Sequence, residues 1–163
     1  MGRHLEIERK FLVKQLPPGW KTRAFSQIIQ GYFPMAKKDL EIRLRRKDWE
    51  HFITIKGGRG HTRLEEEIPI PEPSFRVLWR LTGTTRISKR RYKIPFDPHT
   101  IEIDVFGGSH RGLVTADVEF NSLRESRSFQ PPEWLGREIT GNRQYANETL
   151  ARRRGFPRPR AGR

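Results

Sequence analysis

The chain has 163 residues, the usual size of a single domain and enough to bury a sizeable core. Lys and Arg outnumber Asp and Glu by 33 to 19, a formal charge of +14. We therefore expect an anionic partner, such as a nucleic acid, a membrane surface or a phosphorylated small molecule. The chain has no cysteine, which excludes disulfides and thiolate metal sites, so any metal must use oxygen or imidazole ligands.

The two ends of the chain show no targeting or membrane segment. The N-terminus lacks the apolar core of a signal peptide, and no apolar run approaches the roughly 20 residues that span a bilayer. We therefore predict a cytoplasmic protein with no membrane partner. Residues 152–163 carry six arginines, two prolines and no acidic residue, which is typical of a disordered tail. We predict a domain at residues 1–151 and assign no site to this extension.

Apolar and polar residues alternate with period 2 over much of the chain, with Gly and Pro pairs in between. This pattern predicts a sheet protein with a few helices. The expected strands lie near residues 4–13, 26–34, 40–47, 50–56, 63–70, 86–94, 100–106 and 113–120. Eight strands are enough to close a barrel.

Three helices are expected beside these strands. The segment after Pro73 spaces its apolar residues for one helix face, with the proline in the first turn. Ser122 and Glu125 form a capping box for a second helix. A last helix is expected from about Asn142 through Leu150 to the arginines that follow.

The polar faces of the strands are dominated by carboxylates, lysines and arginines. In the first strand Glu6, Glu8 and Lys10 alternate with apolar neighbours and therefore share one face. At least seven strands have such a face, formed by Glu6, Glu8 and Lys10; Glu41, Arg43 and Arg45; Thr54 and Lys56; Glu65 and Glu67; Lys89 and Arg91; Glu102 and Asp104; and Asp117 and Glu119.

Like charges on one strand face repel each other. Two carboxylates at i and i+2 lie about 7 Å apart, and their repulsion is about 2 kcal/mol at an effective dielectric near 20. Divalent cations would relieve the repulsion among carboxylates, and phosphate oxygens would relieve it among cations. The residues concerned are Glu6, Glu8, Asp117 and Glu119 for metal, and Lys10, Arg43, Arg45, Lys56, Lys89 and Arg91 for phosphate. A solvated sheet face alternates in the same way, so the pattern alone leaves both interpretations open.

Ordered motifs along the chain resemble those of the CYTH, or triphosphate tunnel metalloenzyme, family. Residues 6–10 match the E-x-E-x-K motif near the N-terminus, where the family usually has it. The motifs that follow in order are Gln30-Gly31-Tyr32, Glu41-Ile42-Arg43-Leu44-Arg45, Thr54-Ile55-Lys56, Glu65-Glu66-Glu67, Lys89-Arg90-Arg91-Tyr92, Ile101-Glu102-Ile103-Asp104-Val105 and Ala116-Asp117-Val118-Glu119-Phe120. Residues 134–140 and 145–147 also look like the ending of short bacterial members, so the resemblance covers about residues 4–151.

The resemblance implies an α+β fold, an eight-stranded antiparallel β-barrel whose charged faces line a tunnel and whose apolar faces are covered by helices. It also implies that acidic residues bind Mg²⁺ or Mn²⁺ while inward cations grip a triphosphate. By position the metal ligands are Glu6, Glu8, Asp117 and Glu119; Asp117 stands where the family often has Glu. The substrate ligands are Lys10, Arg43, Arg45, Lys56, Lys89 and Arg91, and Tyr32 either touches the substrate or packs.

The activity that the resemblance implies is hydrolysis of the terminal phosphoanhydride of a linear triphosphate, with Glu8, Glu119 and Lys10 as catalytic residues. Inorganic tripolyphosphate is the expected substrate because the charged site has no obvious platform for stacking a base. Thiamine triphosphatase and class IV adenylyl cyclase are the alternatives. Such cyclases carry His-Phe several residues before the first motif, where this chain has only Met1-Gly2-Arg3-His4-Leu5.

A polyphosphate- or nucleic-acid-binding barrel is the non-enzyme alternative, which the charge of +14 also favours. Nucleic-acid binders need an open basic surface with aromatic residues for stacking. Acids interleave with bases along these strands, so nucleic acid is not the expected partner. The sequence leaves a homodimer open.

Overall fold

The chain forms a curled antiparallel sheet with short helices around it, in a computed structural model that describes residues 7–35, 40–57 and 64–157. The strands are β1 (Ile7–Val13), β2 (Phe25–Tyr32), β3 (Leu40–Lys47), β4 (Glu50–Gly57), β5 (Leu64–Pro69), β6 (Arg86–Phe96), β7 (His99–Phe106), β8 (Val114–Phe120) and β9 (Leu135–Glu138). The helices are α1 (Glu72–Trp79), α2 (Leu123–Ser128) and α3 (Asn147–Arg152), with 3₁₀ turns at Trp20–Thr22, Arg80–Thr82, Gly108–His110 and Arg143–Tyr145. In the part of the chain that the structure describes, no helix is both long and apolar enough to cross a bilayer.

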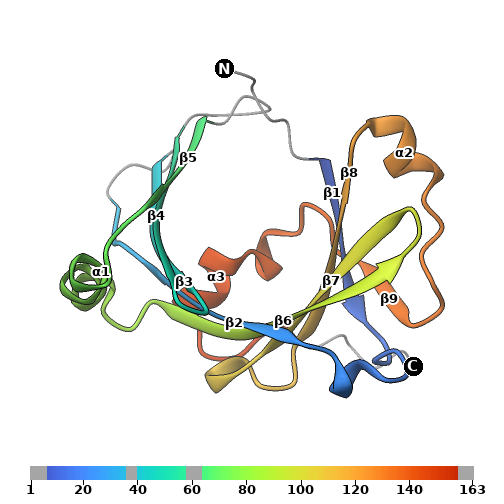
Figure 1. Cartoon of the computed structure of the whole chain (residues 1–163), viewed down its shortest axis with the longest axis horizontal. Helices are drawn as coiled ribbons and strands as arrows, with labels where there is room; N and C mark the ends of the chain where they lie inside the picture. Colours follow the sequence, from blue (N-terminus) through green and yellow to red (C-terminus); the bar gives the residue numbers. More distant parts are fainter. Residues whose placement is uncertain (1–6, 36–39, 58–63, 158–163) are drawn as a thin grey trace.

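Strands pair in the order β5-β4-β3-β2-β6-β7-β8-β1-β9, and every ladder is antiparallel. The eight predicted strands are confirmed to within a few residues at their described ends. The prediction missed β9, whose Leu135 and Glu138 pair with Val13 and Phe11 of β1. Within the described residues no ladder joins β5 to β9, so the sheet curls into a barrel-like shape without the fully closed ladder expected of a barrel (Figure 1).

The register turns the charged strand faces toward the inside of the curl. Arg91 lies opposite Asp104, and Lys10 opposite Asp117, so the charged side chains of neighbouring strands project to the same side. Helix α1 contacts β3 and β4, and α2 contacts β1 and β8. Both helices lie outside the curl in Figure 1, which leaves the charged faces on the concave side. The predicted charged interior is confirmed.

The apolar strand faces form a core on the convex side of the sheet. This core contains Phe11, Tyr92, Ile94, Ile101, Ile103, Ala116, Val118, Phe120, Phe129 and Leu135. Phe129, which directly follows α2, packs its ring against those of Phe11 and Phe120, with centroids 6.3 and 5.2 Å apart. Burial of these side chains supplies the hydrophobic driving force that holds α2 on the sheet.

A second apolar cluster closes one end of the curl. It joins Tyr32, Ile87 and Phe106, on the concave faces of β2, β6 and β7, to Leu150 and Ala151 of α3. Figure 1 shows α3 within the outline of the curled sheet. The concave space is therefore charged along its walls and apolar at the end where α3 packs.

Helices α1 and α2 begin where the sequence predicts. Pro73 lies in the first turn of α1. At the start of α2, Ser122 Oγ accepts a hydrogen bond from the Glu125 backbone N–H at 3.1 Å, and the Glu125 carboxylate accepts one from the backbone N–H of Asn121 at 2.9 Å. The capping box is present, with the carboxylate reaching one residue further back than expected.

The prediction of one continuous last helix from Asn142 is wrong. The Asn142 side chain accepts a hydrogen bond from the Gln144 backbone N–H at 3.1 Å and caps a 3₁₀ turn at Arg143–Tyr145. Ala146 then has extended backbone angles, with φ −65° and ψ 137°, and α3 starts only at Asn147. The extended residue interrupts the helix.

The first half of the basic extension packs on the domain. The boundary expected after residue 151 falls inside α3, which ends at Arg152. Phe156 packs against the second apolar cluster, and the Tyr145 hydroxyl donates a hydrogen bond to the Pro157 carbonyl at 3.0 Å. Residues 158–163 lie outside the described residues.

The 3₁₀ turn at Arg80–Thr82 packs closely against Gly31 of β2, where there is no room for a side chain. A Cβ atom at Gly31 would lie 2.7 Å from Thr82 Oγ1 and 2.8 Å from Trp79 Cζ3. We expect Gly31→Ala to lower the free energy of unfolding by about 1–3 kcal/mol, measured by urea denaturation, because the turn must move away. Gly57→Ala is the control, since its Cβ would meet nothing nearer than Leu40 Cδ1 at 3.8 Å. Equal losses in both variants would contradict the role of this contact.

Candidate active site

The first and last charged strands of the sequence are neighbours in the sheet. β1 pairs with β8, with Glu8 opposite Glu119 and Lys10 opposite Asp117. Directly opposed residues of an antiparallel ladder have Cβ atoms about 4.5–5.5 Å apart. Three predicted metal ligands therefore share one patch of the concave face. Glu6, the fourth, lies outside the described residues.

The chemistry of this patch fits a hard divalent cation. Glu8 and Glu119 are like charges in direct opposition, which destabilises a ladder unless positive charge lies nearby. Mg²⁺ and Mn²⁺ prefer carboxylate oxygen ligands. Within residues 7–35, 40–57 and 64–157, no three carboxylate or imidazole groups already have metal-binding geometry. Asp117 is paired instead with Lys10 and with Arg91 Nη2, the latter at 3.5 Å.

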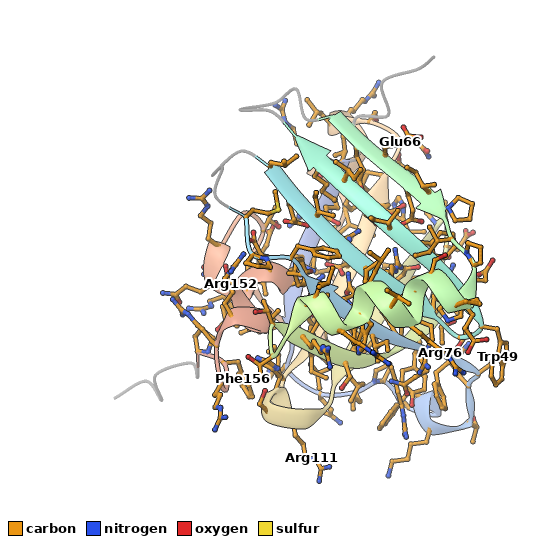
Figure 2. The ribbon with its side chains drawn as sticks, turned by 90° about the vertical axis from the view of Figure 1, so that its left-hand side faces the viewer. Trp49, Glu66, Arg76, Arg111, Arg152 and Phe156 are labelled. Carbon is orange, nitrogen blue, oxygen red and sulfur yellow. The ribbon has the colours of Figure 1, made fainter. Side chains whose placement is uncertain are left out.

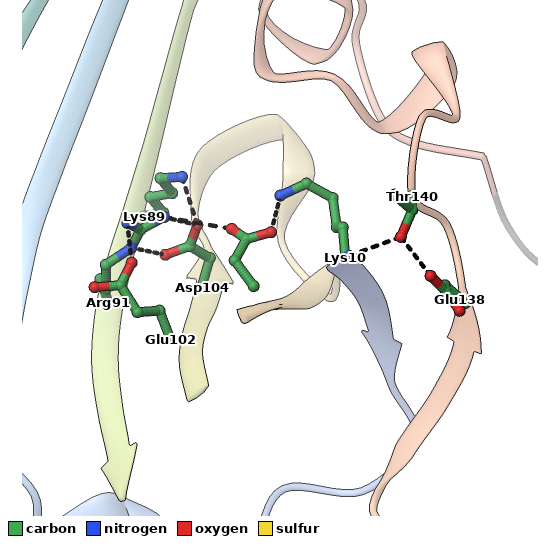
Figure 3. A network of polar contacts seen from close by, with 8 residues as sticks. Lys10, Lys89, Arg91, Glu102, Asp104, Glu138 and Thr140 are labelled. Carbon is green, nitrogen blue, oxygen red and sulfur yellow. Dashed lines mark hydrogen bonds and ion pairs between the residues drawn. The ribbon is translucent and has the colours of Figure 1, made fainter. Parts of the chain in front are cut away.

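An ion network joins β6 to β7 beside this patch (Figure 3). Arg91 donates from Nε and Nη2 to the two carboxylate oxygens of Asp104, both at 2.7 Å, and also pairs with Glu102. Lys89 Nζ lies 2.5 Å from Asp104 Oδ2. The side chains of Asp104 and Lys89 are 0% and 3% exposed, so this pair is desolvated. Lys89 and Arg91 therefore form ion pairs with carboxylates of the protein itself.

Burial and pairing shift the pKa values of the network in opposite directions. Burial by itself would raise the pKa of Asp104, but Lys89 and Arg91 outweigh it and hold that pKa well below its usual range. Burial lowers the pKa of Lys89 to about 8, against the attraction of Asp104. At neutral pH Asp104 is ionised and Lys89 is largely protonated, so the pair carries both charges.

The opposite wall of the concave face is formed by β3, β4 and β5. Arg43 Nη2 and Arg45 Nη1 reach toward the carboxylates of Glu65 and Glu67, at 3.8 and 3.5 Å. Lys56 Nζ lies 2.9 Å from Glu65 Oε2. The two glutamate side chains are 36% and 37% exposed. The glutamates on this wall are therefore more exposed to solvent than Asp104 and lie farther from their arginine partners.

Arg43 and Arg45 on this wall each retain an N–H group that can donate a further hydrogen bond. The buried Nε atoms of Arg43 and Arg45 have no hydrogen-bond partner among the described residues. Burial lowers the pKa of Arg45, and the neighbouring Arg43 guanidinium adds to that shift. Two partly desolvated guanidiniums side by side are an unfavourable arrangement that an incoming oxyanion would relieve.

Tyr32 lies opposite Arg43 in the β2–β3 ladder, at the end of the curl where α3 packs. Its ring is 1% exposed, and its hydroxyl has no hydrogen-bond partner among the described residues. Burial raises the pKa of this hydroxyl, so it stays protonated. The ring packs in the apolar cluster, and contact of the hydroxyl with substrate stays a prediction.

The register brings every described member of the predicted site to the concave face. Those members are Glu8, Lys10, Tyr32, Arg43, Arg45, Lys56, Lys89, Arg91, Asp117 and Glu119. Sequence reasoning missed Asp104, Glu102, Glu65 and Glu67 as partners of the predicted phosphate ligands. Their alternation marks a charged face in the sequence, but assigning a partner requires the order of the strands.

Two proteins similar to this chain are inorganic triphosphatases. It is 40% identical over 148 residues to an inorganic triphosphatase of Nitrosomonas europaea, which covers 90% of this chain and 96% of the relative. It is 35% identical over 149 residues to an inorganic triphosphatase of Acetivibrio thermocellus, with 90% and 93% covered.

Solved structures are similar over most of the chain. The crystal structure of the inorganic triphosphatase NE1496 has a TM-score of 0.72 and 37% identity, covering 90% of this chain and 93% of that chain. A putative adenylate cyclase from Bacillus halodurans has a TM-score of 0.57 at 18% identity, covering 78% and 86%, and shares the fold. The CYTH domain model matches residues 4–153. With the curled antiparallel sheet and its ordered charged faces, this match shows that the chain belongs to the CYTH domain family.

Proposed function

We propose that this protein hydrolyses the terminal phosphoanhydride of inorganic tripolyphosphate, giving pyrophosphate and orthophosphate in a reaction that requires a divalent metal. The observation that carries the proposal is the opposed pair Glu8 and Glu119, on the same concave face as Arg43, Arg45 and Lys56. The relatives at 40% and 35% identity are named inorganic triphosphatases, which supports the same chemistry here.

We assign metal binding to Glu6, Glu8, Asp117 and Glu119, with Mg²⁺ or Mn²⁺ as the ion. A bound ion would neutralise phosphoryl oxygens and make the attacking water more acidic. Glu8 and Glu119 are the catalytic carboxylates in this assignment because their side chains oppose each other from adjacent strands. They would hold and orient the attacking water.

Cations of the concave face would bind the triphosphate and offset the charge that spreads over phosphoryl oxygens in the transition state. Arg43 and Arg45 suit bidentate recognition, while Lys56 acts as a point charge. Phosphate oxygens would compete with the partly exposed Glu65 and Glu67 for these groups. This wall is the main substrate-binding surface in the proposal, with Tyr32 at its closed end.

Lys10 lies within the carboxylate patch. Its ammonium pairs with Asp117 on the neighbouring strand, beside the opposed glutamates. We assign it to both substrate binding and catalysis, since an ammonium there can stabilise charge on the phosphoryl group that is transferred.

We propose that Lys89 and Arg91 do not bind phosphate directly, unlike the role expected from the sequence. Asp104 holds both, and Arg91 in turn contacts Asp117. We propose that Asp104 is a positioning residue, which fixes Arg91 and through it the orientation of Asp117. Lys89 and Arg91 would then act on the substrate mainly through their electrostatic field.

The test of the proposed function is a comparison of substrates. The protein is incubated with tripolyphosphate, thiamine triphosphate or ATP in Mg²⁺ or Mn²⁺, and orthophosphate, pyrophosphate and cyclic AMP are followed. We expect tripolyphosphate to be cleaved fastest, no cyclic AMP to form, and a metal chelator to stop turnover. Faster cleavage of thiamine triphosphate, or formation of cyclic AMP, would show that tripolyphosphate is not the main substrate. The absence of turnover with every substrate in both metals would end the enzymatic proposal.

Glu8→Gln tests the assigned catalytic role. We expect kcat to fall by about 10²–10³-fold, because the amide removes a charged ligand and leaves the shape of the site intact. Tripolyphosphate binding, measured by calorimetry, should persist because the cations of β3 and β4 are unchanged. Glu66→Gln is the matched control, since Glu66 is an exposed glutamate on the outward face of β5. Full activity of the Glu8 variant in saturating metal would contradict the assignment.

Asp104→Asn tests the positioning role through stability. The change leaves Lys89 buried without an anionic partner, so we expect the free energy of unfolding to fall by about 3–5 kcal/mol at neutral pH. Because folding lowers the pKa of Asp104, its stabilisation is present above the usual pKa of aspartate and is lost as the pH falls below it. The variant should therefore lose part of the acid sensitivity seen in chemical denaturation at several pH values.

A control for this variant comes from the outer surface. Glu138 forms a charge pair with Arg9 at 2.7 Å, but the Glu138 side chain is 39% exposed. Glu138→Gln should cost only about 0–1 kcal/mol. A similar cost for the two variants would show that Asp104 is not a buried electrostatic anchor.

A further inference from the structure

The excess positive charge of the chain does not lie in the concave site. By alternation and register, the described part of this face carries the two signs in nearly equal numbers. Its cations are Lys10, Arg43, Arg45, Lys47, Lys56, Lys89, Arg91 and Lys93, and its carboxylates are Glu8, Glu41, Glu50, Glu65, Glu67, Glu102, Asp104, Asp117 and Glu119. The excess of positive charge in the chain, formally +14, therefore comes from residues outside this described face.

Six exposed arginines lie on α3, on the residues next to it, and on two segments that contact those residues. The C-terminal arginine patch, as we define it, consists of Arg111, Arg137, Arg143, Arg152, Arg153 and Arg154, and all six are exposed. Figure 2 shows Arg152, Phe156 and Arg111 along the left and lower side of the molecule. The apolar cluster that contains Leu150 and Ala151 of α3 also contains Tyr32, Ile87 and Phe106 of the concave face.

Contacts in the C-terminal segment hold the patch together. Arg137 Nη2 donates to the Tyr145 hydroxyl at 3.4 Å, and that hydroxyl donates to the Pro157 carbonyl at 3.0 Å. The Phe156 ring lies 3.7 Å from the position that a Cβ on Gly112 would take. Gly112 directly follows the patch arginine of the β7–β8 connection. These contacts connect the segments that carry the patch arginines and pack them on the domain.

The patch has little internal charge compensation. Arg152 pairs with Glu148 at 2.9 Å, with side chains 43% and 40% exposed, so the pair is weak. No ion pair involves the other five patch arginines within the residues that the structure describes. Such a cluster repels itself, and a bound polyanion would relieve the repulsion by replacing small counterions.

We propose that the C-terminal arginine patch binds the phosphodiester backbone of a nucleic acid, at the closed end of the sheet and separately from the concave site. The planar guanidinium matches phosphate oxygens in a bidentate way, and arginines spaced over a surface follow a row of phosphates without reading bases.

A membrane fits this surface less well than a nucleic acid. Among the described residues, the exposed large apolar side chains are Phe25, Trp49, Ile68, Val77, Leu81 and Leu123, and none of them belongs to the patch. Interfacial membrane binding uses exposed apolar residues together with cations. The argument from the sequence against nucleic acid rested on interleaved acids and on the need for aromatic stacking. Of the six patch arginines only Arg152 has a carboxylate partner among the described residues, and contact with phosphates alone requires no stacking.

The test measures binding of a short single-stranded RNA by fluorescence anisotropy at several salt concentrations. We expect the logarithm of the association constant to fall linearly with that of salt concentration, by about 0.7 for each phosphate contacted. The variant Arg111→Gln, Arg152→Gln, Arg153→Gln, Arg154→Gln should bind about tenfold more weakly or worse at low salt, with a shallower slope. Its tripolyphosphate turnover should equal that of the unmodified protein.

The matched control carries Arg23→Gln, Arg80→Gln, Arg124→Gln and Arg127→Gln, which remove the same charge from exposed positions outside the patch. This control should keep its RNA affinity within about twofold. Equal loss in both variants, or no binding of RNA at low salt, would overturn the proposal, as would a preference for anionic lipid vesicles over RNA. Loss of RNA binding with intact turnover is distinct from failure of the proposed function, which would abolish turnover in every variant.

Discussion

The carboxylate of Asp104 is held between Lys89 and Arg91 in a part of the concave face that is almost completely buried. A curled sheet that turns charged faces inward is stable only if opposite charges meet with good geometry, since a desolvated charge without a partner is costly. On β6 and β7 this compensation is internal and tight. On β3, β4 and β5 it relies on Glu65 and Glu67, which are partly exposed and more than 3 Å from the arginines. The ion pairs of β6 and β7 are thus fixed by burial. On β3, β4 and β5, an anionic substrate can replace the glutamates as partners of the arginines.

Much of the fold could be predicted from alternation because an antiparallel strand with one charged and one apolar face is marked at every second residue. Glu8, Lys10, Asp117 and Glu119 were correctly expected to share a charged face, and the family resemblance set that face on the inside. The short β9 was missed because Leu135–Glu138 has too few residues for a period to appear. The split of the last helix was missed because the cap at Asn142 depends on a side-chain hydrogen bond that favours a single turn.

The partners within the site could not be predicted, because they depend on strand order. Asp104 and Glu102 lie in a motif that reads as one more charged face, yet β7 lies between β6 and β8, which makes these residues the counterions of Arg91. The strand order also determines which cations lie inside the curl and which lie outside it. Among the described residues, cations inside the curl are balanced by carboxylates, and the excess cations lie outside it. A single figure for net charge hides this division between a nearly neutral interior and a basic exterior.

The packing of α3 against Tyr32, Ile87 and Phe106 has a consequence for the order in which the molecule can be completed. α3 follows all nine strands in the chain, whereas the strands that carry these three side chains come earlier. As the chain is synthesised, the three strands therefore expose apolar side chains until α3 has been made and has packed on them.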